Sequence, residues 1–223
     1  MSDIGSYDFD NEHRKFGEYE GGRNEAGGRY TKAVLPNGDI YEGQCENGER
    51  HGQGTYRFSN GARYVGDYFH NLKHGQGTFY YPDGSRYEGS WGEDLRQGHG
   101  VYTYLNGDIY DGEWQLNERH GQGVYHYHET GLKYKGTWLN GSMESAGEYI
   151  YSKYRYKGNF VNNKPQGPGK FIFDNGCEQH GEYHRVEQDD AEDVLDNLDY
   201  TPVLRWIPKG IVNLTTSTTV KKT

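Results

Sequence analysis

A short motif recurs seven times along this chain at nearly constant spacing, and it constrains the fold more than any other feature. Each copy begins with Tyr-x-Gly, and successive tyrosines are separated by 22 to 24 residues. The seven are Tyr19, Tyr41, Tyr64, Tyr87, Tyr110, Tyr134 and Tyr156. We call this tyrosine position 0 and count along each repeat from it. A fixed period of this length is typical of proteins that stack one small structural unit, because a single copy cannot bury its own apolar face.

Within each copy the residue types alternate with a period of two. Glycine stands at position +2, an aromatic residue at +4 in most copies, paired glycines at +11 and +13 in most copies, and aromatics at +15 and +17. The most regular copies share these residues: Tyr41, Gly43, Gly52, Gly54, Tyr64, Gly66, Gly75, Gly77, Tyr87, Gly89, Tyr110, Gly112, Gly121 and Gly123. A period of two predicts β-strands. Pairs such as Asn60-Gly61 and Asp83-Gly84 predict tight turns between copies.

The sequence therefore predicts an all-β fold, an elongated single-layer antiparallel sheet of about seven stacked β-hairpins. The glycine at +2 lies between two aromatics, and its missing side chain leaves room for a ring to lie across the backbone. We expect a flexible N-terminus at 1–16, the repeat array at 17–183, and an acidic-then-apolar tail at 184–223. The first copy lacks His-Gly-x-Gly and the sixth has Glu144-Ser145 instead, so both are expected to be less regular.

Composition excludes several classes of protein. Lys and Arg number 24 against 33 Asp and Glu, a net charge of −9, which argues against a nucleic-acid-binding surface. Leu, Ile, Val and Phe are scarce, so the 22 Tyr and 4 Trp must supply a thin aromatic core. The N-terminus is acidic and polar and no apolar run is long enough to span a bilayer. We therefore expect a cytosolic or cytoskeletal protein with Cys45 and Cys177 reduced.

The aromatic residues are the strongest candidates for an interaction surface. Those at position +4 are Tyr68, Trp91, Trp114, Trp138 and Phe160. Two interpretations stay open: these rings pack the sheet on itself, or they form a groove that receives another protein. Trp206 lies between Pro202 and Pro208, which exclude regular helix there. That stretch is either an extended segment that lies along a partner or a flexible tail.

No catalytic, metal or cofactor site is predicted. His51, His74 and His120 recur at one repeat position, but equivalent residues of adjacent copies lie roughly 9–10 Å apart, too far to share one zinc ion. The Gly-x-Gly pairs are followed by aromatic alternation and not by the helix that a phosphate-binding loop requires. Acidic residues recur on one side of the sheet, which indicates a solvated face: Glu18, Glu42, Glu88 and Asp111. The sequence therefore indicates a protein that is not an enzyme.

The motif Tyr-x-Gly-x-Trp-x5-His-Gly-x-Gly, with its period of about 23 residues, resembles the MORN repeat (membrane occupation and recognition nexus) over residues 17–183. The segments GEYEGGRNEAG at 17–27, PDGSRYEG at 82–89 and FDNGCEQHGEY at 173–183 resemble MORN proteins of the radial spoke heads of motile cilia and flagella. The resemblance implies a non-catalytic structural component of the axonemal radial spoke head, which scaffolds other head subunits and helps relay central-pair signals to dynein.

The same resemblance implies the partners. They would be homologues of spoke proteins four, six and nine, other MORN spoke subunits and the central-pair apparatus, within a multi-subunit complex and without nucleic acid. The alternative is a MORN-type adaptor for anionic lipid or a membrane surface. That alternative needs a cationic face, and Lys and Arg are scattered among more numerous acids along this sequence.

Overall fold

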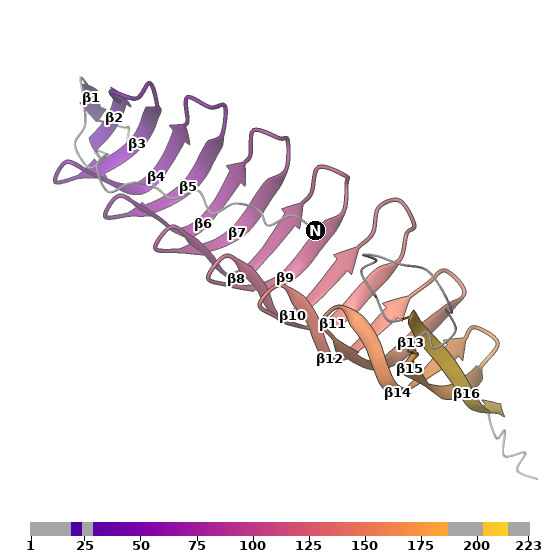
Figure 1. The fold of residues 1–223 in the computed structure, drawn as a ribbon. Coiled ribbons are helices and arrows are strands. Elements are labelled where there is room, and N and C mark those ends of the chain that lie inside the picture. The colour runs from indigo at the N-terminus through magenta and orange to yellow at the C-terminus, as the bar shows by residue number, and fades with distance from the viewer. Residues whose placement is uncertain (1–18, 24–28, 187–202, 214–223) are drawn as a thin grey trace, which may run out of the picture. The chain divides into compact units, whose positions relative to one another are not determined.

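The computed structural model describes residues 19–23, 29–186 and 203–213, so the predicted flexible segment at 1–16 lies outside it. Every regular element in these ranges is a β-strand, which confirms the predicted fold class. Within the same ranges no helix is long and apolar enough to cross a membrane. The chain divides into two compact units, an N-terminal unit (1–129) and a C-terminal unit (130–223), which are described one at a time (Figure 1).

The N-terminal unit is an open antiparallel sheet in which each strand pairs with the next one along the chain. Short loops join the strands, so sequence neighbours are also spatial neighbours. Its strands are β1 (Tyr19–Arg23), β2 (Arg29–Val34), β3 (Ile40–Glu46), β4 (Glu49–Arg57), β5 (Arg63–Phe69), β6 (Leu72–Tyr80), β7 (Arg86–Gly92), β8 (Leu95–Thr103), β9 (Ile109–Gln115) and β10 (Glu118–His126).

The C-terminal unit repeats this plan and then departs from it. Its strands are β11 (Lys133–Leu139), β12 (Ser142–Ile150), β13 (Tyr154–Val161), β14 (Lys164–Phe173), β15 (Cys177–Val186) and β16 (Val203–Asn213), again paired in order. The array thus extends beyond the predicted boundary at 183, since β15 ends at Val186. Part of the predicted tail is also a strand, because β16 pairs with β15. The acidic stretch between these strands lies outside the described residues.

In the second to seventh repeats the two strands of the hairpin are joined by two residues with positive φ, such as His70 (46°) and Asn71 (70°) in the third repeat. Two such residues form the type I′ turn, whose twist matches that of the flanking strands. The equivalent turns are Asn47-Gly48, Glu93-Asp94, Leu116-Asn117, Asn140-Gly141 and Asn162-Asn163. The turns between repeats are those that the sequence predicts: Gly61 (φ 92°) donates its N–H to the carbonyl of Phe58 at 3.0 Å.

The core is a layer of tyrosine rings lying across paired glycines. Tyr64 is fully buried, and its hydroxyl donates to the carbonyl of Asp67 at 3.0 Å. Gly66 and Gly77 are directly paired across β5 and β6. A Cβ on Gly66 would lie 2.4 Å from the Cα of Gly77, and one on Gly77 would lie 2.3 Å from the Tyr64 hydroxyl. The ring over the backbone is therefore the tyrosine two residues earlier, which confirms and specifies the predicted role of the +2 glycine.

The irregular repeats keep the hairpin by different means. Most repeats have a β-bulge at the first glycine of Gly-x-Gly, for example Gly75 with φ of 57°. The sixth repeat has Ser145 at this position, and Ser145 adopts φ of 59°. The bulge is therefore retained with a residue that lacks glycine's conformational freedom. The first repeat forms the short pair β1 and β2, without a register shift between them.

Candidate functional site

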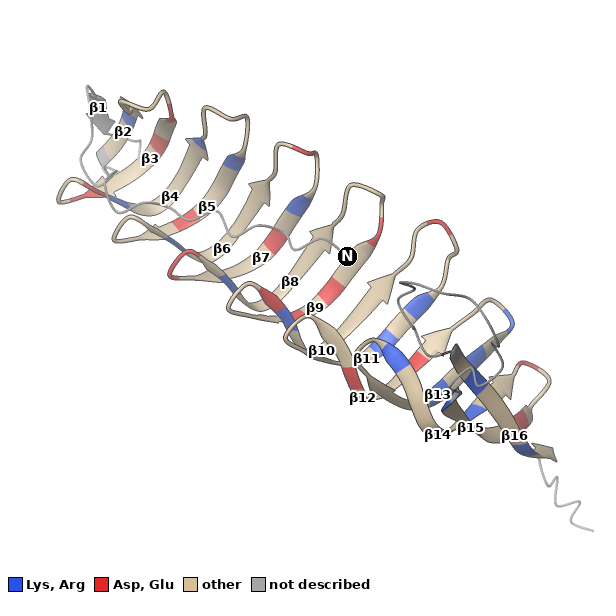
Figure 2. Ribbon diagram, in the orientation of Figure 1, with Lys and Arg blue, Asp and Glu red and all other residues tan. Residues whose placement is uncertain are grey.

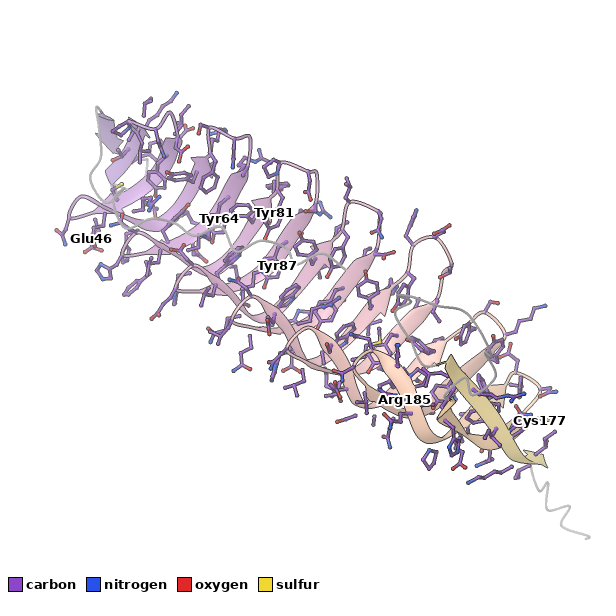
Figure 3. The ribbon with its side chains drawn as sticks, in the orientation of Figure 1. Glu46, Tyr64, Tyr81, Tyr87, Cys177 and Arg185 are labelled. Atoms are coloured by element: carbon purple, nitrogen blue, oxygen red, sulfur yellow. The ribbon has the colours of Figure 1, made fainter. Side chains whose placement is uncertain are left out.

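The two faces of each sheet differ in chemistry, and we name them by position 0. The aromatic face carries Tyr64 and its equivalents, and the polar face carries the residues between them. Figure 3 labels Tyr64 and Tyr87, which occupy position 0 on β5 and β7. Alternation along each strand puts positions +2 and +4 on the aromatic face and +1 and +3 on the polar face. The candidate binding surfaces are therefore these two faces and the strand β16.

The five candidate rings at position +4 are buried within the chain itself: Tyr68, Trp91, Trp114, Trp138 and Phe160 are each at most 6% exposed. Each packs edge-on against position-0 tyrosines, as Trp91 does against Tyr64 at 5.4 Å and Tyr87 at 5.1 Å. The indole N–H of Trp91 donates to the carbonyl of Gly77 at 3.0 Å. In the chain alone, these rings thus pack adjacent hairpins together, and their part in partner binding stays a prediction.

Next to the buried rings lies a ladder of half-exposed ones at position +17. In the N-terminal unit these are Phe58, Tyr81, Tyr104 and Tyr127. They alternate with buried rings at +15, so that Phe79, Tyr81 and Tyr102 follow one another at centroid distances of 4.6 and 5.6 Å. Tyr81 is labelled in Figure 3. The accessible aromatic area of this face therefore comes from position +17, which the sequence interpretation passed over in favour of +4.

Position +9 holds a cation in every regular repeat of the N-terminal unit: Arg50, Lys73, Arg96 and Arg119. Arg96 is 5% exposed, pairs across the hairpin with Trp91, and lies 4.6 Å from the ring centroid of Trp114. Its guanidinium donates to the backbone carbonyl of Asn117 at 2.8 Å. Lys73 and Arg96 are thus buried between rings, and Arg50 and Arg119 are partly buried there, where cation–π attraction and hydrogen bonds offset part of their lost hydration.

Lys73 is the most demanding of these cations because it ends in a compact ammonium. Its Nζ lies 2.7 Å from Oδ1 of Asp94 and 5.4 Å from the Trp91 ring. Burial lowers the pKa of Lys73, and the Asp94 carboxylate opposes that shift. The backbone N–H of Lys73 also donates to Oδ1 of Asp94, at 2.8 Å. Oδ1 of Asp94 therefore contacts both the backbone N–H and the side-chain ammonium of Lys73 in the preceding repeat.

In four repeats the second residue of the type I′ turn bridges to the preceding repeat. The N–H of Asn71 donates to the carbonyl of Arg50 at 3.0 Å, and its Oδ1 accepts the Arg50 N–H at 2.9 Å. The same two hydrogen bonds join Asp94 to Lys73, Asn117 to Arg96 and Asn163 to Met143. An Asx side chain thus extends the ladder between repeats. Sequence reasoning missed it, although Asn or Asp at position +7 in most repeats was a usable signal.

Trp206 packs on its own chain. β16 places it opposite Tyr183, with its ring 5.0 Å from Phe171 and 5.1 Å from Tyr183, and its indole N–H donates to Gln179 at 3.3 Å. The extended conformation that its prolines indicate is present, and the surface it covers belongs to β14 and β15. β16 still exposes Ile207, Ile211 and Val212. Contact between this strand and a partner stays a prediction.

The described residues of the two units differ in net charge. From residue 30 to 129 eight cationic side chains stand against fourteen acidic ones, a net of −6. Residues 130–185 and 204–212 hold ten cationic side chains and five acidic ones, a net of +5. Figure 2 shows Lys and Arg on β11, β13 and β14 as well as on strands of the N-terminal unit. Within the described residues, acidic side chains therefore outnumber cationic ones in the N-terminal unit, and cationic ones outnumber acidic ones in the C-terminal unit.

The histidines do not gather into a metal site. Among the described residues no three His, Cys, Asp or Glu side chains are placed to hold a metal ion. His51 instead lies 5.2 Å from the half-exposed ring of Phe69, and His70 lies 4.4 Å from the same ring. Two acids at position +3 serve structure: Oδ2 of Asp67 accepts the backbone N–H of Gln76 at 2.8 Å, and Oε1 of Glu113 accepts that of Gln122 at 2.9 Å.

Comparison with known proteins identifies the class first. The MORN repeat family matches residues 41–63, 64–86, 87–109, 110–129, 134–154 and 156–178, which is more than half of the chain. The fold and the glycine-cradled tyrosines are those of a MORN-repeat protein.

Comparison with whole chains narrows this class. The radial spoke head 1 homolog of Cyprinus carpio is 60% identical over 216 residues, 96% of this chain and 99% of that protein. The radial spoke head 1 homolog of Mus musculus is 56% identical over 222 residues, 96% of this chain and 72% of that protein. The chain therefore belongs to the family of radial spoke head 1 homologues.

Among solved structures, the TCP domain of SAS-4 (dCPAP) from Drosophila melanogaster, in complex with a proline-rich motif of Ana2 (dSTIL), matches 73% of this chain and 88% of that chain. The TM-score is 0.47 and the identity 12%. At those values the likeness supports no conclusion about fold or function.

Proposed function

We propose that this chain is a non-catalytic structural component of the radial spoke head, in the axoneme of motile cilia and flagella. The observation that carries the proposal is the 60% identity to a radial spoke head 1 homolog across almost the full length of both chains. The structure supports it physically. A one-layer sheet leaves both faces and its terminal strands accessible, and such surfaces suit a scaffold that several subunits contact at once.

The proposed partners are homologues of spoke proteins four, six and nine, other MORN spoke subunits, and the central-pair apparatus. On the aromatic face we assign contact to the half-exposed ladder at position +17, with the buried +4 rings holding it in place. Tyrosine is favoured in interfaces because it offers a large rigid surface with a polar tip. At the C-terminal end, the exposed side of β16 is the second proposed contact. Through these contacts the chain would scaffold the head and help relay central-pair signals to dynein.

The test follows a tagged full-length chain in ciliated cells. Demembranated and washed axonemes are expected to retain it, and high salt is expected to extract it together with the proposed spoke partners. Replacing Tyr81 and Tyr104 by Ser should reduce retention, whereas Leu105→Ser is the matched control because Leu105 is 73% exposed in a turn. Recovery of the wild-type chain wholly in the detergent-soluble fraction would contradict the proposal.

A second candidate function, attachment to an anionic membrane surface, is favoured by the basic polar face of the C-terminal unit. Lys133, Lys135, Arg155 and Lys157 are all exposed there. Each cation near an anionic bilayer contributes about 1 kcal/mol. Flotation with vesicles containing phosphatidylserine at physiological salt tests this, and absence of flotation excludes it.

A further inference from the structure

Position +1 of the repeat changes the sign of its charge between the two units. In the N-terminal unit it holds Glu42, Glu88 and Asp111, with Val65 in the remaining regular repeat. In the C-terminal unit it holds Lys135 and Lys157. The register is the same in both, since each position +1 pairs across its hairpin with position +14, as Asp111 does with Val124 and Lys157 with Lys170.

The neighbours strengthen the contrast. In the C-terminal unit one cross-strand row reads Lys133, Ile150, Arg155 and Ile172, and the next reads Lys135, Glu148, Lys157 and Lys170. The acids in or beside these rows are already paired: Glu148 lies 3.4 Å from Lys157, and Glu178 lies 3.0 Å from Lys170. Even so, the cationic side chains stay accessible, with the Lys157 side chain 44% exposed.

In the N-terminal unit the acids at +1 are the accessible charges. The Asp111 side chain is 49% exposed, with its Oδ1 3.1 Å from Nε2 of the exposed His99, and Glu88 is also exposed. The cations of the same face are partly engaged, since Arg57 lies 3.5 Å from Glu42 and Arg63 stacks 4.3 Å from the ring of Tyr80. The acids that this face offers to another molecule are therefore Glu88 and Asp111, with Arg86 an exposed cation two residues before Glu88 on β7.

The spacing between charged side chains is also the same on the two faces. Glu88 and Asp111 are equivalent residues of consecutive repeats, as are Lys135 and Lys157, so each pair is two strands apart, roughly 9.6 Å. Twisted sheets pack face to face with their strands nearly aligned, at about −30°. Two acidic side chains of one face can thus meet two lysines of the other at the same time.

We propose that the polar face of the N-terminal unit of one copy docks on the polar face of the C-terminal unit of a second copy of this chain. Glu88 and Asp111 of one copy meet Lys135 and Lys157 of the other, and Ile150 and Ile172 supply apolar area beside them. The inference concerns the isolated protein and stands whether or not the chain belongs to the spoke head. Exposed ion pairs are individually weak and screened by salt, so the association is modest and strongly salt-dependent.

Sedimentation equilibrium of the full chain measures this directly. At 20 mM NaCl the weight-average mass is expected to rise with protein concentration, and the apparent Kd should increase at least about tenfold at 300 mM. Two double variants each reverse the sign of the charged pair on one face. They are Lys135→Glu with Lys157→Glu, and Glu88→Lys with Asp111→Lys. Each alone should lose association by about tenfold or more, because like charges then face each other.

The decisive step is rescue in trans. Mixing the two variants restores opposite charges across the contact, so a mixed complex is expected with an affinity near that of the wild type. Lys153→Glu with Arg185→Glu is the matched control, since it changes the net charge equally and lies off the rows described above. It should weaken association much less. Circular dichroism checks that each variant is folded, and the four reversals combined in one chain should self-associate again.

Several outcomes would overturn the proposal. A wild-type chain that stays monomeric at 20 mM NaCl up to about 100 µM is one, since even weak pairs at low salt should register there. Loss of association in each variant without rescue in the mixture is another, and it would mean that the two faces do not meet. Flotation of the wild-type chain with anionic vesicles, without any self-association, would assign the basic face to membranes instead.

Discussion

The N-terminal and C-terminal units are built from one repeat but are stabilised differently at position +9. In the N-terminal unit this position is a buried cation between rings, such as Arg96, 4.6 Å from the centroid of Trp114. In the C-terminal unit the same position holds Met143 and Pro165, which pair across the hairpin with Trp138 and Phe160. The geometry of the hairpin is common to both. What fills the space against the +4 ring can therefore change from a cation to an apolar residue without changing the fold.

The largest effect on stability is expected at the glycine of position +2, which both units share. Gly66→Ala in the N-terminal unit and Gly136→Ala in the C-terminal unit each place a Cβ against the paired backbone, 2.4 Å from the Cα of Gly77 and 2.7 Å from that of Gly147. Each should lower the free energy of unfolding by about 3 kcal/mol, because backbone cannot move aside as a flexible side chain can. Urea unfolding measures this. Gly210→Ala is the control for added methyl groups, since space around Gly210 is open and its φ is not positive.

The next prediction tests the difference at position +9 itself. Lys73→Met should cost about 2 kcal/mol in urea unfolding, because it leaves the Asp94 carboxylate without its ammonium partner. The double variant Lys73→Met with Asp94→Asn recreates the Met143–Asn163 arrangement of the C-terminal unit and should recover most of that loss. If the double variant is no more stable than the single one, the two arrangements are not interchangeable.

A third prediction concerns the position-0 hydroxyl. Tyr87 donates its hydroxyl to the carbonyl of Ser90 at 2.9 Å, whereas the buried hydroxyl of Tyr156 has no hydrogen-bond partner. Tyr87→Phe should therefore cost about 1 kcal/mol, and Tyr156→Phe should cost nothing or stabilise slightly, in urea unfolding at pH 7. An equal loss in both variants would show that the Tyr156 hydroxyl is satisfied in solution.

The same tyrosine gives a pH dependence. Burial raises the pKa of Tyr156 from its ordinary 10 to about 12. The unfolded chain then loses this proton at a lower pH than the folded one. The stabilisation is fully present below pH 10 and is lost as the pH rises through about 12. Stability measured between pH 9 and 12 should fall less steeply in Tyr156→Phe than in the wild type.

The smallest effect lies within the C-terminal unit. Ser145→Gly relieves positive φ (59°) at the bulge of the sixth repeat and should stabilise by about 1 kcal/mol. The reciprocal Gly167→Ser puts a side chain at φ of 70° in the seventh repeat, where no atom lies close enough to clash, and should destabilise by a similar amount. Thermal unfolding compares the two. Effects of the same sign would show that backbone strain is not the cause.

Much of the fold is predictable from the sequence because its signals are local and repeated. A period of two indicates strands, the glycine at +2 indicates a ring across the backbone, and pairs such as Asn60-Gly61 indicate turns. The turns at +6 and +7 escaped this reasoning because residues such as Glu93 and Leu116 are not typical of positive φ. Their conformation follows from the strands that they must connect.

The candidate surface was less predictable. Alternation puts Trp91 and Tyr81 on the same face, but only the neighbouring hairpins decide that Trp91 is covered and Tyr81 half-exposed. The sequence likewise places Trp206 in an extended segment without revealing that its own array is the surface it covers.

The sequence by itself determined the repeat, which residues of a strand share a face and the family, since these depend on residues close together in the chain. Only the tertiary structure decided which cations are buried and which are free. Arg96 and Lys157 are both cations on strands of one repeat pattern, yet one lies between rings and the other faces solvent. A strand's two faces differ in what stacks against them, and that depends on neighbours about 20 residues away.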